Sequence, residues 1–454
     1  MQKLFNEVGS LDKRCYEKFK LNEDILMEHA SNGMAEFIRN KFDKNSKIIV
    51  VVGSGNNGAD GLALARLLYA DYDVSIFYAK QPKSKMAVLQ KQRVDAIGIV
   101  ECQEITKCTV LVDAIVGTGF SGEFDKNISN LIKTMNSVDA YKIACDVPSG
   151  YKFYADTTLT MGALKIAMFL DAYKDFVGDI KVLNLGVSRL VYETDTNWNL
   201  LDIDDLKLPY RDANDTHKGS FGHLAIAYGE KGGASILSAS SALRFGAGLV
   251  TLVGFKNDLI PHSIMNSTTL PTTTSALAIG MGLGDEFSDA ELEKFLDNNY
   301  PVIADADIFT MPILKSILKR KDVVLTPHPK EFIIALKTLN IADITIKELQ
   351  NNRFKYAEMF CQIYPHITLL LKGANVIIGQ KDRFFINPHG SSKLAKGGSG
   401  DVLSGLIGAL LAQGYNSLEA TITASLTHTK LAKNYKGADF SLTPDDLIGG
   451  ISYL

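Results

Sequence analysis

The strongest constraint on how this chain folds is the alternation of short, continuously apolar segments with helical ones. In the first half the apolar segments are KIIVVV (47–52), DVSIFY (73–78), TVLVDA (109–114) and YKIACD (141–146). Strands that are apolar along their whole length are typical of parallel sheets covered by helices on both faces. The sequence therefore predicts an α/β fold, preceded by an amphipathic helix within residues 21–42.

The same pattern restarts near residue 200, which predicts a second α/β domain. Residues 191–219 are rich in Asp, Asn and Thr and lack periodicity, as is typical of interdomain linkers. We place the boundary within residues 195–212 and expect domains at 1–200 and 201–454. A length of 454 residues fits two or three domains, since single cores are built on a scale of about 150 residues. The apolar segments of the second domain are 222–229, 248–254, 301–307, 322–328 and 367–373.

Composition excludes several classes of protein. The net charge of −3 lacks the basic excess that binding to nucleic-acid phosphates requires. Apolar runs end after about five residues, far short of the roughly 18 to 20 that cross a bilayer, and the N-terminus has no apolar signal segment. The five cysteines are scattered without CxxC spacing, which indicates a reducing compartment. We expect a cytoplasmic protein with small-molecule partners, not membranes or nucleic acid.

The first glycine-rich loop, Gly53–Gly58, follows a predicted strand and opens a predicted helix. Its G-x-G-x-x-G spacing is typical of dinucleotide-binding Rossmann folds. The next strand, however, is followed by lysines (residues 80, 83 and 85) instead of the acidic residue that holds a ribose, although lysines could contact a 2′-phosphate. Asp60 fits two interpretations, a residue that stabilises the first helical turn and a ligand contact.

Polar residues also follow two later strands of the same predicted sheet. Asp113 is followed by the glycines of residues 117–122, and Asp146 is followed by Ser149. Each alone could be turn chemistry. Because ligands of open parallel sheets bind at the carboxyl edge of the strands, their convergence predicts a site there. Asn57, Asp113 and Ser149 offer oxygen atoms that suit a weakly held, hard cation, and we favour a monovalent one.

In the second domain, Gly397–Gly400 runs directly into a helix that begins with Asp401. Such a turn directs several backbone N–H groups and the positive helix end at one point, which binds anions. The alternative is a flexible turn capped by Asp401. A carboxylate beside an anion site can take the proton from an attacking hydroxyl, so the segment predicts phosphoryl transfer to an alcohol. The chain contains no GxxxxGK[ST] motif, which excludes a Walker-type loop.

Other residues of the second domain have two interpretations each. The turn at Gly232–Ala234 can face a ligand, and the glycines of residues 280–285 can serve either a ligand or the chain itself. His328, held between two prolines, either satisfies a hydrogen bond or takes part in chemistry, and zinc is excluded by the lack of further ligands nearby. Lys372, before Gly373, is either a phosphate contact or a solvated turn lysine.

The motifs VVGSGNNGADG, VDAIVGTGFSGE and DVPSG resemble those of the epimerase domain of the bifunctional NAD(P)H-hydrate repair enzymes. The resemblance implies a Rossmann-like domain that interconverts the R and S forms of hydrated NADH or NADPH. It implies potassium on Asn57, Asp113 and Ser149, and substrate contacts by Asp146, our candidate for proton transfer. Ala59 stands where the family usually has glycine. The other implied substrate contacts are Asn56, Asn57, Gly58, Ala59, Asp60, Gly117, Thr118, Gly119, Phe120, Ser121, Gly122 and Glu123.

The motifs KGSFGH, GGAS, GMGLG, LTPHPKEF, LLLKGANVIIG and GGSGDVLSG resemble the dehydratase domain of the same enzymes, a branch of the ribokinase-like fold. Met281 and Ser399 depart from the Pro and Thr common in the family. The resemblance implies that nucleotide binds at Lys372, Gly373, Ala374, Asn375, Val376 and Gly400, beside the Gly398, Ser399 and Gly400 amides. It places hydrated NAD(P)H at Ala234, Gly284, His328 and Asp401.

These observations together predict a two-step repair enzyme. The first domain would epimerise hydrated cofactor, and the second would dehydrate the S form by phosphoryl transfer, with Asp401 as base. The resemblance favours ADP over ATP, implies magnesium with the nucleotide, and suggests a homo-oligomer. The alternatives are a ribokinase-like sugar or vitamin kinase with a regulatory first domain, and a first domain that binds cofactor without turnover.

Overall fold

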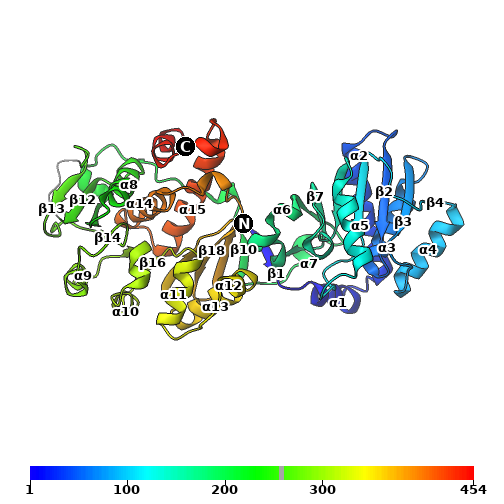
Figure 1. Cartoon of the computed structure of the whole chain (residues 1–454), viewed down its shortest axis with the longest axis horizontal. Helices are drawn as coiled ribbons and strands as arrows, with labels where there is room; N and C mark the ends of the chain where they lie inside the picture. The colour runs from blue at the N-terminus through cyan, green and yellow to red at the C-terminus, as the bar shows by residue number, and fades with distance from the viewer. Residues whose placement is uncertain (255–259) are drawn as a thin grey trace. The chain divides into compact units, whose positions relative to one another are not determined.

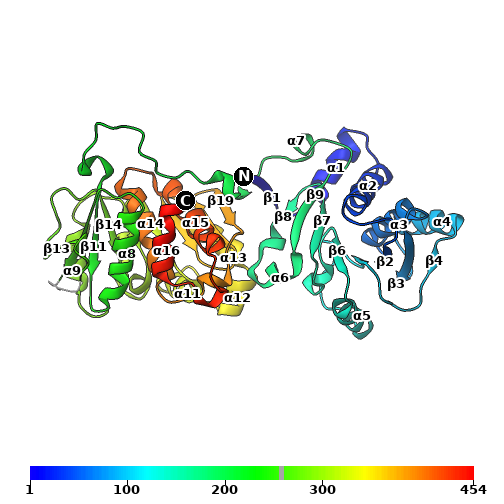
Figure 2. The same cartoon turned by 90° about the horizontal axis from the view of Figure 1, so that it is seen from above.

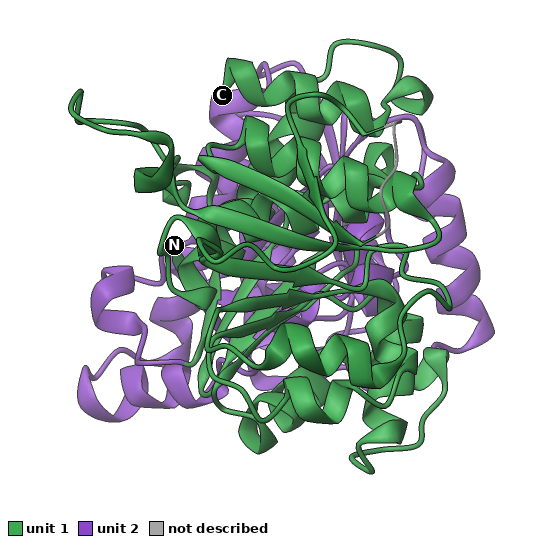
Figure 3. Cartoon of the chain, turned by 90° about the vertical axis from the view of Figure 1, so that its left-hand side faces the viewer, with its two compact units in different colours: residues 1–2, 197–454 green, residues 3–196 purple. Residues whose placement is uncertain are grey.

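The computed structural model describes residues 1–254 and 260–454 and divides into two compact units. The N-terminal unit comprises residues 3–196 and the C-terminal unit comprises residues 197–454 together with Met1 and Gln2 (Figure 3). Each unit contains a predominantly parallel sheet with helices, so the predicted α/β class with two domains is confirmed (Figure 1). No helix in the described part of the chain is long and apolar enough to span a bilayer.

The sheet of the N-terminal unit has the strand order β4-β3-β2-β5-β6-β7-β9, and each neighbouring pair is parallel. The four predicted strands are β2 (Lys47–Val52), β3 (Asp73–Tyr78), β5 (Val110–Ala114) and β6 (Tyr141–Cys145). The remaining elements are β1 (Gln2–Phe5), β4 (Val100–Glu101), β7 (Thr157–Met161), β8 (Leu164–Lys165), β9 (Asp179–Leu183), α1 (Gly9–Lys18), α2 (Glu23–Lys41), α3 (Asn56–Leu68), α4 (Lys85–Ile97), α5 (Lys126–Ser137), α6 (Lys174–Val177) and α7 (Arg189–Tyr192).

The continuous apolar strands of this unit are explained by burial on both faces. Along β2, Ile48, Val50 and Val52 belong to one hydrophobic cluster, which includes residues of α2 and α3. The alternate residues Ile49 and Val51 belong to a second cluster, which includes residues of α5. Figure 2 shows α2 and α3 on one side of the sheet and α5 on the other. Because both faces are covered, polar ligand-binding groups can gather only at strand ends.

The C-terminal unit has the strand order β13-β12-β11-β14-β15-β16-β17-β18-β19-β10. Pairing is parallel except where the hairpin strand β18 contacts its two neighbours. The strands are β10 (Trp198–Leu200), β11 (His223–Tyr228), β12 (Leu249–Gly254), β13 (Met265–Ser267), β14 (Ala276–Ile279), β15 (Val302–Ala304), β16 (Val323–Leu325), β17 (Ile367–Leu371), β18 (Val376–Gln380) and β19 (Arg383–Asn387). The helices are α8 (Gly232–Arg244), α9 (Asp289–Leu296), α10 (Leu314–Ile317), α11 (Pro329–Thr338), α12 (Ile346–Asn351), α13 (Arg353–Ile363), α14 (Ser399–Ala412), α15 (Ser417–Asn434) and α16 (Pro444–Gly450).

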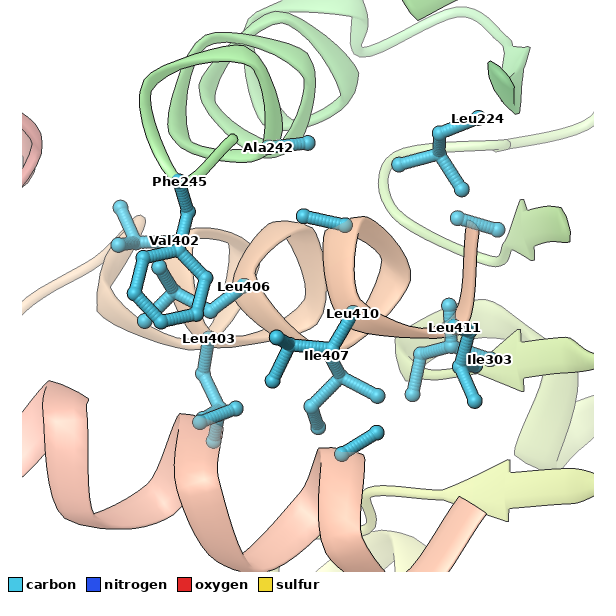
Figure 4. Packing of buried hydrophobic residues seen from close by; sticks show 14 of the residues in the cluster. Leu224, Ala242, Phe245, Ile303, Val402, Leu403, Leu406, Ile407, Leu410 and Leu411 are labelled. Carbon is cyan, nitrogen blue, oxygen red and sulfur yellow. The ribbon is translucent and has the colours of Figure 1, made fainter. Parts of the chain in front are cut away.

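Helix α14 lies at the centre of this unit. Its apolar side chains pack with Ala242 of α8 and with Phe245, which directly follows that helix. They also pack with strand residues such as Leu224 and Ile303 (Figure 4). Glycine at position 405 permits the close approach of α8. A Cβ atom there would lie 2.0 Å from Oγ of Ser241 and 2.1 Å from the carbonyl oxygen of Ser238. The packing of α8 against α14 therefore requires glycine, which has no side chain, at position 405.

We predict that Gly405→Ala lowers the free energy of unfolding of the C-terminal unit by about 3 kcal/mol, because α8 and α14 must separate. The matched control is Gly449→Ala on α16, where a Cβ meets no atom within 4 Å, and it should change stability by less than about 1 kcal/mol. Trp198, the sole tryptophan, is buried in this unit, so its fluorescence in a urea titration reports the transition. Equal midpoints for the two variants would contradict the packing argument.

Candidate functional sites

The first glycine-rich loop folds tightly because two of its glycines contact backbone. A Cβ at Gly53 would lie 1.8 Å from the carbonyl oxygen of Ile115, and one at Gly58 would lie 2.1 Å from that of Gly53. Ala59 is fully buried and packs against a small cluster that includes Met27. The methyl group that departs from the family pattern therefore lies in the core and leaves the ligand side of the loop unchanged.

The N-terminal unit contains a cavity of about 500 Å³ at the carboxyl end of its sheet. A second cavity of about 510 Å³ shares Gly117–Phe120 and Lys165 with the first and also includes Gly122. Gly58, Ala59, Ser121 and Glu123 line neither of these two cavities. The predicted site residues that the structure brings together around the first cavity are Asn56, Asn57, Asp60, Gly117, Thr118, Gly119, Phe120 and Asp146.

Asp146 lies at the centre of a buried hydrogen-bond network. Its Oδ1 accepts from Nζ of Lys165 at 2.5 Å, from the backbone N–H of Met161 at 3.1 Å and from Oγ1 of Thr160 at 3.4 Å. Lys165 also donates to Oγ1 of Thr160 and to the carbonyl of Met161, both at 2.8 Å. Its side chain is only 2% exposed. Sequence analysis missed Lys165, although a single lysine within the apolar segment GALKIAM was a usable signal.

The predicted cation ligands lie at one turn of this unit. Asp113 accepts hydrogen bonds from the backbone N–H of Ser149 at 2.8 Å and from its Oγ at 2.6 Å. The Ser149 Oγ lies 3.3 Å from the carbonyl oxygen of Val116, and Asn57 Oδ1 lies beside the adjacent Gly117. Burial raises the pKa of Asp113 to about 6. Asn57 Nδ2 is buried without a hydrogen-bond partner among the described residues. Four oxygen donors therefore surround one turn, which fits a hard monovalent cation.

In the C-terminal unit, the turn before α14 leaves backbone donors available. Gly398 adopts φ +89°, which favours glycine, and a Cβ there would lie 2.6 Å from the Pro444 ring. The N–H groups of Gly398, Gly400 and Asp401 have no acceptor among the described residues. The N–H of Ser399, in contrast, donates to the carbonyl of Lys396 at 3.3 Å. The turn thus presents N–H groups that could bind an anion, and the Ser399 amide is not one of them.

The side chain of Ser399 is directed into the core. Its Oγ lies 3.1 Å from Nε2 of His428, which is almost fully buried. Burial lowers the pKa of His428 to about 4, so this imidazole is neutral at physiological pH. The Ser399–His428 contact therefore anchors the start of α14 from inside the unit.

Lys372 lies beside the anion site instead of in solvent. Its Nζ donates to both carboxylate oxygens of Asp305, at 2.7 and 2.9 Å, and would be 3.4 Å from a Cβ at Gly400. Asp305 is 2% exposed and also accepts from Oγ of Ser404 at 2.7 Å. The alternative of a solvated turn lysine is therefore wrong. Sequence analysis did not assign a role to Asp305, although it directly follows the apolar strand β15.

Asp401, in the first turn of α14, has no lysine or arginine hydrogen-bonded to its carboxyl group among the described residues. Burial, and then the negative charge of Asp305, raise the pKa of Asp401 to about 6, against the opposing effect of Lys372. A carboxyl group with a pKa near 6 can accept a proton at neutral pH and return it readily, which is the property required of a general base. Its position beside unpaired amides and Lys372 suits it to phosphoryl transfer.

His328 caps helix α11. Its Nδ1 accepts from the backbone N–H groups of Lys330 and Glu331, at 3.1 and 3.2 Å. Its side chain is 48% exposed, and Nε2 lies 3.3 Å from the Glu331 carboxylate. Burial and the charge of Lys372 lower the pKa of His328. The hydrogen-bonding interpretation accounts for Nδ1, while the opposite edge of the ring remains accessible to a ligand.

The turn at Lys372–Val376 joins β17 to β18, and a buried arginine fixes its backbone through hydrogen bonds. Arg353 is 1% exposed and donates to the carbonyls of Lys372 at 3.0 Å, Asn375 at 3.2 Å and Leu371 at 3.3 Å. Arg353 thereby fixes the backbone from which Lys372 projects. No local sequence signal identifies it, because its partners are about 20 residues away.

The remaining predicted contacts, Ala234 and Gly284, lie at neighbouring turns. Ala234 is in the first turn of α8, and its Cβ would be 3.1 Å from a Cβ at Gly282. Gly284 has φ +57°, and its N–H donates to the carboxylate of Asp307 at 3.0 Å. The glycines of residues 280–285 therefore serve the chain itself at least in part, since three of them adopt positive φ.

We predict that Asp401→Asn stabilises the C-terminal unit above pH 6. In the wild type, neutral Asp401 contributes stability below its unfolded pKa of 3.8, and this contribution is lost as the pH rises through about 6. The difference of about two pKa units corresponds to about 3 kcal/mol. Trp198 fluorescence in urea titrations should show the variant more stable at pH 8 and equal to the wild type near pH 4. A pH-independent difference would contradict this account.

Comparisons with known proteins agree with the division of the chain into two units. A family model described as YjeF-related protein N-terminus matches residues 23–167, and a model described as NAD(P)H-hydrate dehydratase matches residues 225–451. The bifunctional NAD(P)H-hydrate repair enzyme Nnr of Helicobacter pylori is 39% identical over 474 aligned residues, which cover 100% of both chains. The enzyme of the same name from Escherichia coli is 28% identical and covers 89% of this chain and 83% of its own.

Two solved structures are similar to the C-terminal part. The ADP/ATP-dependent NAD(P)H-hydrate dehydratase from Bacillus subtilis, co-crystallised with ATP and Mg²⁺, is 27% identical, covers 54% of this chain and 92% of its own, and has a TM-score of 0.46. A ribokinase-like superfamily protein from Enterococcus faecalis is 25% identical, covers 57% of this chain and 96% of its own, and has a TM-score of 0.47. The two family models and the full-length relatives confirm the resemblance: the chain belongs to the family of bifunctional NAD(P)H-hydrate repair enzymes.

Proposed function

We propose that this chain repairs hydrated NADH and NADPH in two steps. The N-terminal unit interconverts the R and S forms, and the C-terminal unit dehydrates the S form with a nucleotide as phosphoryl donor. The observation that carries the proposal is the start of α14, where unpaired backbone N–H groups, Lys372 and Asp401 meet. Family membership supports both activities.

In the dehydratase step, Asp401 takes the proton from the ring hydroxyl as that oxygen attacks the terminal phosphoryl group. The N–H groups of Gly398 and Gly400 and the ammonium of Lys372 stabilise the charge on the transferred group. The phosphorylated oxygen then leaves as phosphate, and loss of a neighbouring ring proton restores the double bond of NAD(P)H. Phosphorylation is useful because hydroxide is a poor leaving group and phosphate a good one.

Nucleotide and magnesium bind in this proposal at the turn of residues 372–376 and the start of α14. Among the described residues there is no cluster of three or more His, Cys, Asp or Glu side chains that could hold a metal, and Asp305 is already paired with Lys372. This donor set fits a Mg²⁺ ion held mainly by the nucleotide phosphates, where it would neutralise phosphate charge. We propose ADP as the preferred donor, by the family resemblance. Hydrate would contact Ala234, Gly284, His328 and Asp401.

In the epimerase step, the hydrate binds in the cavity above the N-terminal sheet. We propose contacts by the loop of residues 56–60 and the loop of residues 117–123, with Asp146 as the group that transfers the proton. Asp146 supports this role because it lines the cavity and is held in place by Lys165. Within the loops, the residues that line one of the two cavities are the strongest candidates.

We propose further that the enzyme is a cytoplasmic homo-oligomer. All five cysteines are free thiols and four of them are buried, which suits a reducing compartment. The oligomeric state rests on the family resemblance alone.

The test of the repair function is recovery of reduced-nicotinamide absorbance when the full chain meets mixed R and S hydrated NADH with ADP, with ATP or without nucleotide. Complete recovery that requires a nucleotide supports both activities, and the faster donor identifies the preferred one. Recovery that stops at the S fraction would contradict epimerase activity. Absence of recovery, with phosphorylation of a stable alcohol instead, would support the kinase alternative.

We predict that Asp401→Asn lowers nucleotide-dependent dehydration at least about 100-fold, because the general base is removed. Nucleotide affinity, measured by calorimetry with ADP and Mg²⁺, should remain within about threefold. Chromatographic conversion of the R to the S form is the internal control for the same chain and should be unchanged. Retained dehydration in this variant would overturn the assignment of Asp401.

We propose that potassium binds the oxygen atoms of Asn57, Asp113 and Ser149, together with the Val116 carbonyl. We predict that KCl raises the thermal unfolding midpoint of the wild type relative to tetramethylammonium chloride at equal ionic strength. Ser149→Ala should require about tenfold more KCl for the same shift, because one ligand is lost, and Asp113→Asn should show no shift. Equal responses to the two salts in the wild type would contradict the site.

A further inference from the structure

Two carboxyl groups of the N-terminal cavity have opposite surroundings. Asp146 accepts a hydrogen bond from the ammonium of Lys165 and two more from neighbouring donors. An adjacent cation and several donors favour the ionised form of a carboxyl group. Asp146 is therefore suited to accept a proton.

Asp60 lines the same cavity but has none of these partners. It lies in the second turn of α3, is 7% exposed, and its carboxyl group has no hydrogen-bond donor or ion-pair partner among the described residues. The charged groups that face it are the carboxylates of Asp146, Asp12 and Glu23, and Lys165, whose ammonium is already bound to Asp146. Burial, and then these carboxylates, raise the pKa of Asp60 well above its usual value. Burial in this cavity therefore favours the protonated form of the Asp60 carboxyl group.

A carboxyl group bound to a cation and a buried carboxyl group without such a partner, placed in one cavity, are suited to act as a base and an acid. We propose that Asp60 is a second catalytic residue of the N-terminal unit, the acid that acts opposite Asp146 during epimerisation. This inference rests on the proposed epimerase function and assigns to Asp60 a proton transfer in addition to contact with the substrate.

The chemistry of the substrate requires such a pair. Addition of water to the ring double bond beside nitrogen places a hydroxyl on the carbon attached to that nitrogen. Asp146 takes the hydroxyl proton, the oxygen electrons form a carbonyl, and the carbon–nitrogen bond breaks. Asp60 gives its proton to the departing nitrogen, which leaves an open-chain aldehyde. Rotation about the adjacent carbon–carbon bond exposes the other face.

Ring closure then reverses these transfers. Nitrogen attacks the rotated carbonyl, Asp60 regains its proton from nitrogen, and Asp146 returns its proton to oxygen. Atoms and electrons balance without a co-reactant, as an isomerisation requires. Simultaneous action of the base and the acid avoids both a free alkoxide and an unprotonated leaving nitrogen.

The decisive variant is Asp60→Asn, because asparagine has the size and charge of a neutral aspartic acid but cannot donate that proton. We expect R-to-S conversion of hydrated NADPH, followed by chromatography without nucleotide, to fall at least about 100-fold in kcat. KM should change less than about threefold, and the affinity for NADPH as a binding probe should be retained. A role in binding alone would instead raise KM and leave kcat unchanged.

The Asp60 variants are also tested for correct folding. The circular-dichroism unfolding midpoint of Asp60→Asn should equal or exceed that of the wild type, and dehydration of the S form with ADP should be unchanged. Asp60→Glu, which restores an acid with a displaced proton, should recover part of the kcat. In the wild type, kcat should fall at high pH, where Asp60 ionises and can no longer donate a proton.

The outcomes separate this inference from the function on which it rests. A wild type that does not convert R to S above the uncatalysed rate would contradict the epimerase function itself. A wild type that converts, with Asp60→Asn within about threefold of its kcat, would overturn the role of Asp60 and leave the epimerase function standing.

Discussion

Burial of both faces of each parallel sheet is the constraint on which both sites depend. Residues of β2 alternate between two hydrophobic clusters, and α14 is enclosed by α8, α15 and the second sheet. The carboxylates Asp113, Asp146 and Asp305 lie at or next to the carboxyl ends of strands, where the sheets are open to ligands. Because the strands of each sheet are predominantly parallel, their carboxyl ends meet at one edge within each unit, which is where ligands of open parallel sheets bind.

Each unit also places one paired and one unpaired carboxyl group at its site. In the N-terminal unit Asp146 is bound to Lys165, while the Asp60 carboxyl group forms no ion pair among the described residues. In the C-terminal unit Asp305 is bound to Lys372, while burial raises the pKa of Asp401 to about 6. One carboxyl group of each site is bound to a lysine, and desolvation favours the neutral form of the other. The two candidate sites thus share the same arrangement of one lysine-bound and one unpaired carboxyl group.

Much of the fold and part of the sites could be predicted from local patterns. The apolar segments 47–52 and 109–114 contain strands β2 and β5, and the glycine-rich turn before Asp401 leads directly into α14 with N–H groups that have no acceptor among the described residues. Such patterns are predictable because they depend on only a few neighbouring residues. Lys165 and Arg353 were missed, since their partners lie in other elements. The free Ser399 amide expected from composition is absent, because its N–H bonds to Lys396 and its side chain to His428.

The sequence by itself determined the α/β class, the two-part organisation, and the loops where ligands approach, because glycine, strand apolarity and helix-start residues act locally. Only the tertiary structure decided which charges are paired. Lys372 joins Asp305 across 67 residues, and Lys165 joins Asp146 across 19, while the carboxyl groups of Asp60 and Asp401 form no ion pair among the described residues. The protonation state of a buried carboxyl group depends on such distant neighbours and on burial, and neither is written in the residues beside it.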